Sequence, residues 1–128
     1  MIVHLDTSVL IDALTGTRRS LPALTALVTE GHRIAVSTIV LYEWLRGPRS
    51  RVELGAQEEL LPRENAVAFG SAEADVAAKL YAKVRRARGR EIDLAIAACV
   101  VANEGAFWTL NPADFRDIPG LRLVAPPS

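Results

Sequence analysis

The segment from Arg90 to Ala102, with the sequence REIDLAIAACVVA, constrains the fold of this chain more than any other. After Glu91 every residue in it is apolar except Asp93. A helix that is apolar on all sides is usually buried in a protein core. A carboxylate left there without a partner costs several kcal/mol. Asp93 therefore requires a proton, a paired cation or a metal ion.

Size and charge narrow the class of protein. Half of the 128 residues are hydrophobic, which suits one domain with a substantial core. The formal net charge is zero, so any surface that attracts nucleic acid has to be local. Because Cys99 is the only cysteine, an internal disulfide is excluded, and we interpret Cys99 as a core residue. Because there is neither a signal segment nor an apolar run of about 18 residues, we expect a soluble, cytoplasmic protein that does not bind membranes.

Short apolar runs alternate with segments of helical pattern along the whole chain. Strands are expected at residues 2–5, 33–36, 66–69, 106–110 and 121–124. Helices are expected at residues 7–14, 20–30, 38–46, 52–61, 71–88 and 90–102, with Ser20 and Ser71 among the N-caps. This alternation predicts an α/β domain over residues 1–128, with a central parallel sheet of four to five strands flanked by helices. A Pro-rich tail is expected from about residue 125.

Four acidic residues occupy unusual places in this pattern. Asp6 follows the first strand and Asp114 follows the strand at 106–110, where the binding crevice of an open α/β sheet lies. Glu43 and Asp93 interrupt otherwise apolar helices. Four clustered carboxylates would repel one another, and a hard divalent cation such as Mg²⁺ or Mn²⁺ removes that penalty. The pattern favours metal-assisted hydrolysis of phosphodiester bonds.

Each of these acids also has a simpler interpretation. Asp6 could cap the helix that follows it, and Asp114 could be an ordinary turn residue. Glu43 could be a partly exposed helix residue. Asp93 could interact with the helix dipole or with Arg90. No single acid decides between the interpretations.

Four motifs in order resemble the PIN-domain ribonucleases, and most closely the VapC-type toxins of prokaryotic toxin–antitoxin pairs. They are HLDTSVLI, YEWLRG, EIDLAIAA and WTLNPADFRDIPGL, and the resemblance runs from Ile2 to about Val124. It implies a PIN-like fold in which four acids are catalytic residues and metal ligands, namely Asp6, Glu43, Asp93 and Asp114. It also implies that Ser8, Thr109 and Asn111 orient water or carboxylates. Asn111 is neutral where many members of the family carry a further acid.

The resemblance further implies the activity and the partners. We expect an endoribonuclease dependent on Mg²⁺ or Mn²⁺ that cleaves RNA with metal-activated water. We also expect a homodimer and a cognate antitoxin that covers the acidic cleft. Two alternatives stay open: an RNA-processing PIN nuclease without an antitoxin, and a PIN-like RNA- or protein-binding module without turnover. Retention of all four acids favours catalysis, and the short chain favours the toxin.

Two arginine clusters could receive the RNA backbone. The candidates are Arg46 and Arg49 in RGPRSR, and Arg85, Arg86, Arg88 and Arg90 in RRARGR. Contacts of this kind give affinity that depends on salt and not on sequence. The alternative is a solvated helix end that complements the helix dipole. Trp44 and Trp108 adjoin apolar segments and are interpreted as core or interface residues.

Overall fold

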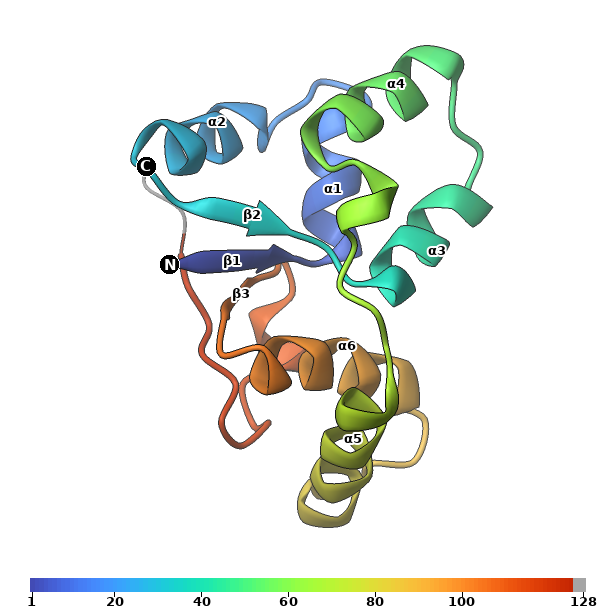
Figure 1. The fold of residues 1–128 in the computed structure, drawn as a ribbon, viewed down its shortest axis with the longest axis vertical. Coiled ribbons are helices and arrows are strands. Elements are labelled where there is room, and N and C mark those ends of the chain that lie inside the picture. The colour runs from blue at the N-terminus through green and yellow to red at the C-terminus, as the bar shows by residue number, and fades with distance from the viewer. Residues whose placement is uncertain (126–128) are drawn as a thin grey trace.

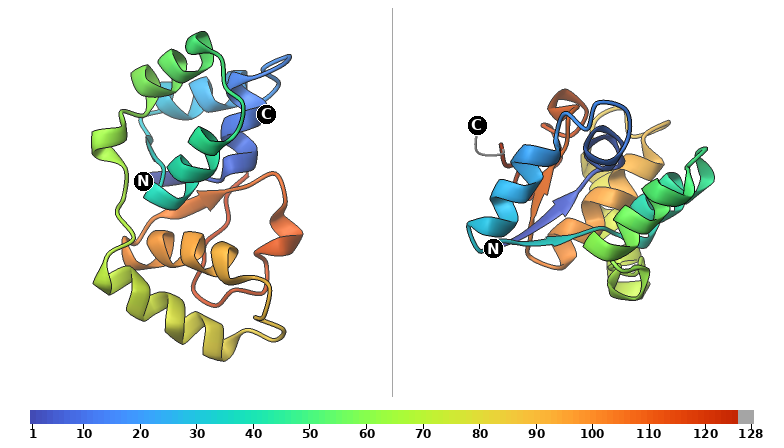
Figure 2. Two further views of the ribbon diagram at one scale, coloured as in Figure 1. Left: turned by 90° about the vertical axis from the view of Figure 1, so that its right-hand side faces the viewer. Right: turned by 90° about the horizontal axis from the view of Figure 1, so that it is seen from above.

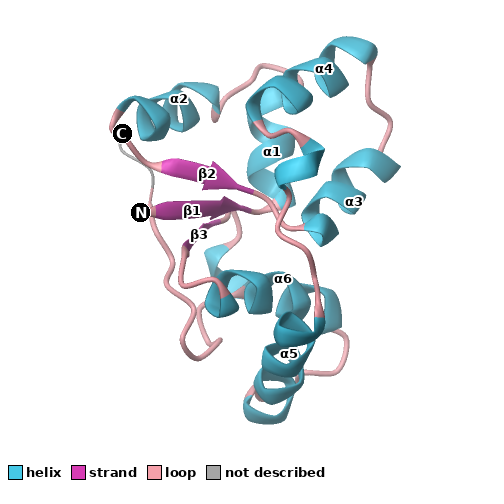
Figure 3. Ribbon diagram, viewed as in Figure 1, coloured by secondary structure: helices cyan, strands magenta, loops and turns pink. Residues whose placement is uncertain are grey.

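Three parallel strands form the centre of the structure, a computed structural model that describes residues 1–125 (Figure 1, Figure 3). The strands are β1 (Ile2–Leu5), β2 (Arg33–Ala35) and β3 (Ala106–Trp108), in the order β2-β1-β3. Val3 lies opposite Ile34 on one side and Ala106 on the other. The central strand is apolar apart from His4, and Val3, His4 and Leu5 are buried, as expected of a parallel sheet covered on both faces. The Pro-rich tail predicted from about residue 125 lies outside the described residues, apart from Ala125.

The prediction of four to five strands was wrong for the described residues. The segments at 66–69 and 121–124 each form a single parallel bridge, Ser37 to Val67 and Phe107 to Leu123. A longer pairing at the first edge is prevented because β2 passes into a helix at Thr38. At the other edge, after the left-handed turn at Gly120 (φ 78°), the pairing that the structure describes is limited to two hydrogen bonds at Phe107, whose N–H donates to Arg122 and whose carbonyl oxygen accepts from Val124.

Helices cover both faces of the sheet (Figure 1, Figure 2). They are α1 (Thr7–Leu14), α2 (Leu21–Thr29), α3 (Thr38–Arg46), α4 (Arg51–Leu60), α5 (Ser71–Lys83) and α6 (Glu91–Ala102). Two 3₁₀ turns, η1 (Arg63–Asn65) and η2 (Pro112–Asp114), complete the structure. Helices α1 and α2 lie on one face, and α6 lies on the other with α5 packed against it. Helix α3 lies beyond the C-terminal ends of β1 and β2.

Several helix ends differ from the prediction. Helix α5 stops at Lys83 instead of Arg88, because the chain turns extended at Val84 and buries Val84 and Ala87. The N-cap position of α5 is Gly70, so Ser71 is its first helical residue. Ser20 precedes α2 as predicted, but its hydroxyl donates to Asp12 at 2.6 Å instead of capping the helix.

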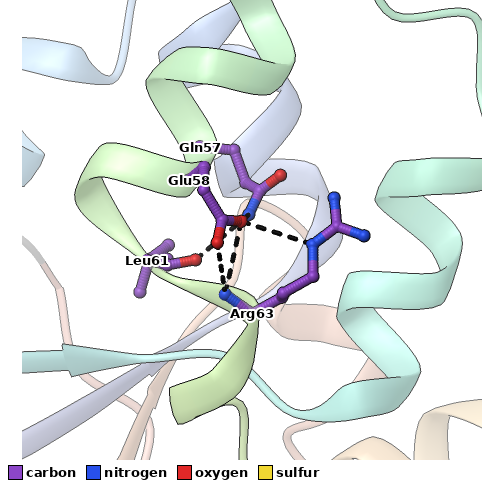
Figure 4. Close-up of polar contacts among 4 residues, drawn as sticks. All are labelled: Gln57, Glu58, Leu61 and Arg63. Atoms are coloured by element: carbon purple, nitrogen blue, oxygen red, sulfur yellow. Dashed lines mark hydrogen bonds and ion pairs between the residues drawn. The ribbon is translucent and has the colours of Figure 1, made fainter.

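Side chains at the end of α4 fix the path of the chain toward the sheet edge (Figure 4). The buried Gln57 donates its side-chain amide to the carbonyl oxygen of Leu61 at 3.1 Å and to Glu58 at 3.2 Å. Glu58 in turn pairs with Arg63 at 3.4 Å. These contacts close the turn into η1, from which the chain crosses the end of β2 to reach Val67.

The apolar segment from Arg90 to Ala102 forms α6, the central helix of the core. Every residue of α6 from Leu94 to Val100 is buried. Trp44 and Trp108 are also buried, which confirms their interpretation as core residues. Cys99 is fully buried, and burial raises the pKa of its thiol to about 11. Within residues 1–125, none of the helices has both the length and the apolarity needed to span a membrane.

Candidate active site

Asp6 is the most firmly held of the four acids. It follows β1 and caps α1, where its Oδ1 accepts from the backbone N–H of Thr7 at 2.9 Å. Its Oδ2 accepts from the hydroxyls of Thr109 at 2.6 Å and Ser8 at 3.1 Å. The residue is only 7% exposed. The cap interpretation and the site interpretation therefore apply to the same carboxylate.

The supporting residues form a short network around Asp6. The Ser8 hydroxyl accepts from the backbone N–H of Leu110 at 3.1 Å, and the Thr109 hydroxyl accepts from that of Asn111 at 3.0 Å. This network ties the loop after β3 to the start of α1. The Asn111 side chain is exposed, and only its backbone N–H takes part in this network.

Glu43 reaches the same place from α3. Its Oε1 accepts from the Thr7 hydroxyl at 2.6 Å, and its Oε2 pairs with Arg46 at 3.7 Å. Thr7 thus holds Glu43 beside Asp6, with one donor directed to each carboxylate. Sequence reasoning assigned no role to Thr7, although its position directly after Asp6 in the HLDTSVLI motif was a usable signal.

Asp93 lies in the first turn of α6 and is electrostatically coupled to the other acids. Burial raises the pKa of Asp93, and the negative charges of Asp6, Asp114 and Glu43 raise it further, against the opposing charge of Arg90. The pKa of Asp6 is raised as well, first by burial and more weakly by Glu43, although its hydrogen bonds oppose the shift. Asp114, at the end of η2, has an exposed side chain. Asp6 and Glu43 are therefore joined through Thr7, and Asp93 lies near enough to Asp6, Asp114 and Glu43 for their charges to raise its pKa.

The chemistry of this donor set fits a hard divalent cation. All four groups are carboxylates, and their mutual repulsion is relieved by positive charge. No group of three Asp, Glu, His or Cys side chains among residues 1–125 is gathered closely enough to hold an ion as it stands. Ion binding would have to draw the carboxylates inward from their present positions.

The arginine candidates fall into two groups. Arg85, Arg86 and Arg88 are exposed in the loop between α5 and α6. The other three make contacts within the protein. Arg46 pairs with Glu43 and lies 5.5 Å from the centre of the Tyr42 ring. Arg49 donates to the carbonyl oxygen of Trp44 at 2.9 Å and stacks 4.3 Å from its ring. Arg90 pairs with Asp117.

Comparison with known families assigns nearly the whole chain. The model of the PIN domain matches residues 3–121. The chain belongs to the PIN domain family. Comparison of this PIN domain with curated protein sequences gives no match.

Several solved structures similar to this PIN domain are VapBC or toxin–antitoxin complexes. A chain of VapBC2 from Rickettsia felis, bound to a DNA fragment from its promoter, matches with a TM-score of 0.76 and 22% identity, covering 97% of this chain and 98% of that one. A chain of DNA-bound VapBC from Salmonella typhimurium matches with a TM-score of 0.75 and 23% identity, covering 97% of each. A toxin–antitoxin complex from Klebsiella pneumoniae matches with a TM-score of 0.72 and 25% identity, covering 98% of each.

Proposed function

We propose that this PIN domain is a Mg²⁺- or Mn²⁺-dependent endoribonuclease and the toxin of a toxin–antitoxin pair. The observation that carries the catalytic part is that Thr7 holds Asp6 and Glu43 side by side after the central strand, with Asp93 near enough for the charges of Asp6, Asp114 and Glu43 to raise its pKa. Retaining such a cluster is costly for a fold unless a cation uses it.

The four acids have different roles in this proposal. Asp6, Glu43 and Asp93 are the principal ligands, and Asp114 completes the pocket. A bound ion would polarise a phosphoryl oxygen and lower the pKa of a water molecule. Thr7, Ser8 and Thr109 orient the Asp6 and Glu43 oxygens through hydrogen bonds, so that these two carboxylates have a defined position from which an ion can draw the set together. The backbone N–H of Asn111 supports Thr109 in this role.

The toxin part of the proposal rests on the structural relatives. The chains that this PIN domain resembles over almost their entire length come from VapBC and other toxin–antitoxin complexes. A cognate antitoxin that covers the acidic cleft, and a homodimer, are the partners that follow. The substrate is RNA, approached through the exposed Arg85, Arg86 and Arg88 and, from α3, through Arg46.

Replacement of single acids tests the catalytic assignment. We expect Asp93→Asn and Glu43→Gln to reduce Mg²⁺-dependent RNA cleavage by roughly 100-fold or more, since each removes a charged ligand. Glu91→Gln is the matched control, because Glu91 lies in the same helix turn as Asp93 but is exposed. Circular dichroism checks that the variants fold. Undiminished cleavage in both site variants would show that Asp93 and Glu43 are not catalytic ligands.

Expression in a bacterial host tests the toxin role separately. A toxin should arrest growth and leave discrete RNA 5′ ends that disappear in Asp93→Asn. Cleavage in vitro with normal growth would instead favour an RNA-processing nuclease. Folded protein with RNA or protein binding and no cleavage would favour a binding module.

A further inference from the structure

Arg90 makes a tight set of contacts on the rim of the acidic site. Its two terminal nitrogens, Nη1 and Nη2, donate to the two carboxylate oxygens of Asp117 at 2.8 and 2.7 Å. Nη2 also donates to the backbone carbonyl oxygen of Asp114 at 2.9 Å. The Arg90 side chain is only 23% exposed. A guanidinium engaged in this way has little capacity left to bind an RNA phosphate.

These contacts join two segments that each carry an acid of the site. Arg90 occupies the N-cap position of α6, three residues before Asp93. Asp114 and Asp117 belong to the segment that follows β3. That segment is anchored in the core by Phe115 and Ile118, each 3% exposed, and the Phe115 ring packs 4.8 Å from that of Phe107.

The apolar anchors alone do not set the position of Asp114. Its side chain is exposed, and its backbone N–H donates only within its own turn, to Asn111 at 3.0 Å. The contact from Arg90 to the Asp114 carbonyl reaches this residue from α6. The same guanidinium places a positive charge beside Asp93 and Asp114, which opposes their repulsion.

We propose that Arg90 is a positioning residue, which holds the Asp114 loop against the start of α6 so that Asp114 faces Asp93. This inference rests on the proposed metal site, and it replaces an RNA contact as the role of Arg90. The bidentate geometry matters because the planar guanidinium fits the two oxygens of one carboxylate while a spare N–H still reaches the carbonyl. A lysine supplies the charge without this fork.

Two measurements on the whole chain test whether Arg90 positions the Asp114 loop. Hydrogen–deuterium exchange follows residues 109–118, and Mn²⁺ titration followed by electron paramagnetic resonance measures affinity for the metal. For Arg90→Ala we expect faster exchange in this segment and Mn²⁺ affinity weakened by about three- to tenfold. Arg90→Lys should restore only part of the affinity. The double variant Arg90→Ala/Asp117→Asn should be little worse than Arg90→Ala alone, because Arg90→Ala already removes the pair with Asp117.

Arg122→Ala is the control for removal of one exposed arginine, and it should change neither readout. Unchanged exchange in Arg90→Ala, or faster exchange with unchanged Mn²⁺ affinity, would overturn the proposal. Failure of the proposed function is seen in a different sample: a wild-type protein that neither binds Mn²⁺ nor cleaves RNA overturns that proposal without reference to any Arg90 variant.

Discussion

The carboxyl group of Asp93 sits where its environment disfavours the negative charge. It lies in the first turn of a helix whose next seven residues are all buried. Its pKa is therefore raised, mainly by burial and then by Asp6, Asp114 and Glu43. Its position near the positive end of α6 compensates only in part. A metal-free fold retains Asp93 at a cost in stability.

A stability measurement on Asp93→Asn tests this cost. Because the folded state holds the proton of Asp93 more tightly than the unfolded state does, the ionised group destabilises the fold at neutral pH. We expect metal-free Asp93→Asn to melt higher than wild type at pH 7, by on the order of a few degrees. The difference should shrink as the pH falls through the raised pKa of Asp93 toward its ordinary value of 3.8.

Comparing two variants across pH removes other titrating groups from this test. Burial lowers the pKa of His4, but His4 titrates equally in both proteins and so cancels in the difference. Mg²⁺ should raise the melting temperature of wild type more than that of Asp93→Asn. A variant less stable than wild type at pH 7 would show that the Asp93 carboxylate stabilises the fold.

At the scale of elements, β1 and the start of β3 approach too closely for a side chain at Gly105. A Cβ there would lie 2.5 Å from Cδ2 of His4 and 3.1 Å from the backbone oxygen of Ile2. His4 is 2% exposed, and neither of its ring nitrogens has a hydrogen-bond partner among the described residues. Its ring acts as packing material that fills the space beside Gly105.

We expect Gly105→Ala to lower the free energy of unfolding by about 1–3 kcal/mol, because the new methyl group overpacks a buried strand junction. In a His4→Ala background, where the ring is gone, the same change should cost less. Urea denaturation of the four proteins of this cycle measures the coupling, expected to exceed about 0.5 kcal/mol. If the effects of Gly105→Ala and His4→Ala on the free energy of unfolding simply add, the His4 ring moves aside for the new methyl group without a loss of stability.

The helices and strands predicted correctly are those whose own residues carry a clear pattern, such as an apolar run or a capping residue. Helix α6 follows from an uninterrupted apolar run, and Ser37 caps α3 as its type and position predict. The outer strands were overpredicted because the apolar runs at 66–69 and 121–124 carry no information about how much of a neighbouring edge is available. Likewise, the end of α5 depends on burial of Val84 and Ala87, which is a tertiary effect.

The same division holds for the candidate site. The identities of the acids, and the places of Asp6 and Asp93 at element ends, could be read from the chain. Their long-range partners could not: Thr7 donates to Glu43 across 36 positions, and Thr109 donates to Asp6 across 103. The pairing of Arg90 with Asp117 spans 27 positions and has no local signal. Sequence patterns therefore named the candidate acids, and only the folded structure shows which residues hold them in place.

For the whole molecule, a net charge of zero conceals a separation of charge that suits an RNA-cleaving enzyme. Asp6 follows the C-terminal end of β1, Thr7 joins it to Glu43, and Asp93 lies in the first turn of α6. The exposed Arg85, Arg86 and Arg88 lie in the loop that leads directly into α6 and Asp93. In the proposed function, this loop would hold the phosphate backbone while the acids, with a bound metal ion, act on a bond nearby. Affinity for RNA should then come from the loop, and turnover from the acids.

Replacing all three loop arginines by alanine separates these two roles. We use the Asp93→Asn background so that RNA stays intact while its binding to the protein is measured at several salt concentrations. Each lost phosphate contact should reduce the slope of log affinity against log salt by about 0.7, so that three contacts give about 2. Mn²⁺ affinity, measured with Asp93 restored, should stay unchanged.

The matched control replaces Arg18, Arg33 and Arg122, which are also exposed and change the net charge equally. If the control lowers the slope as much as the loop variant does, RNA responds only to net charge, and the loop has no special role.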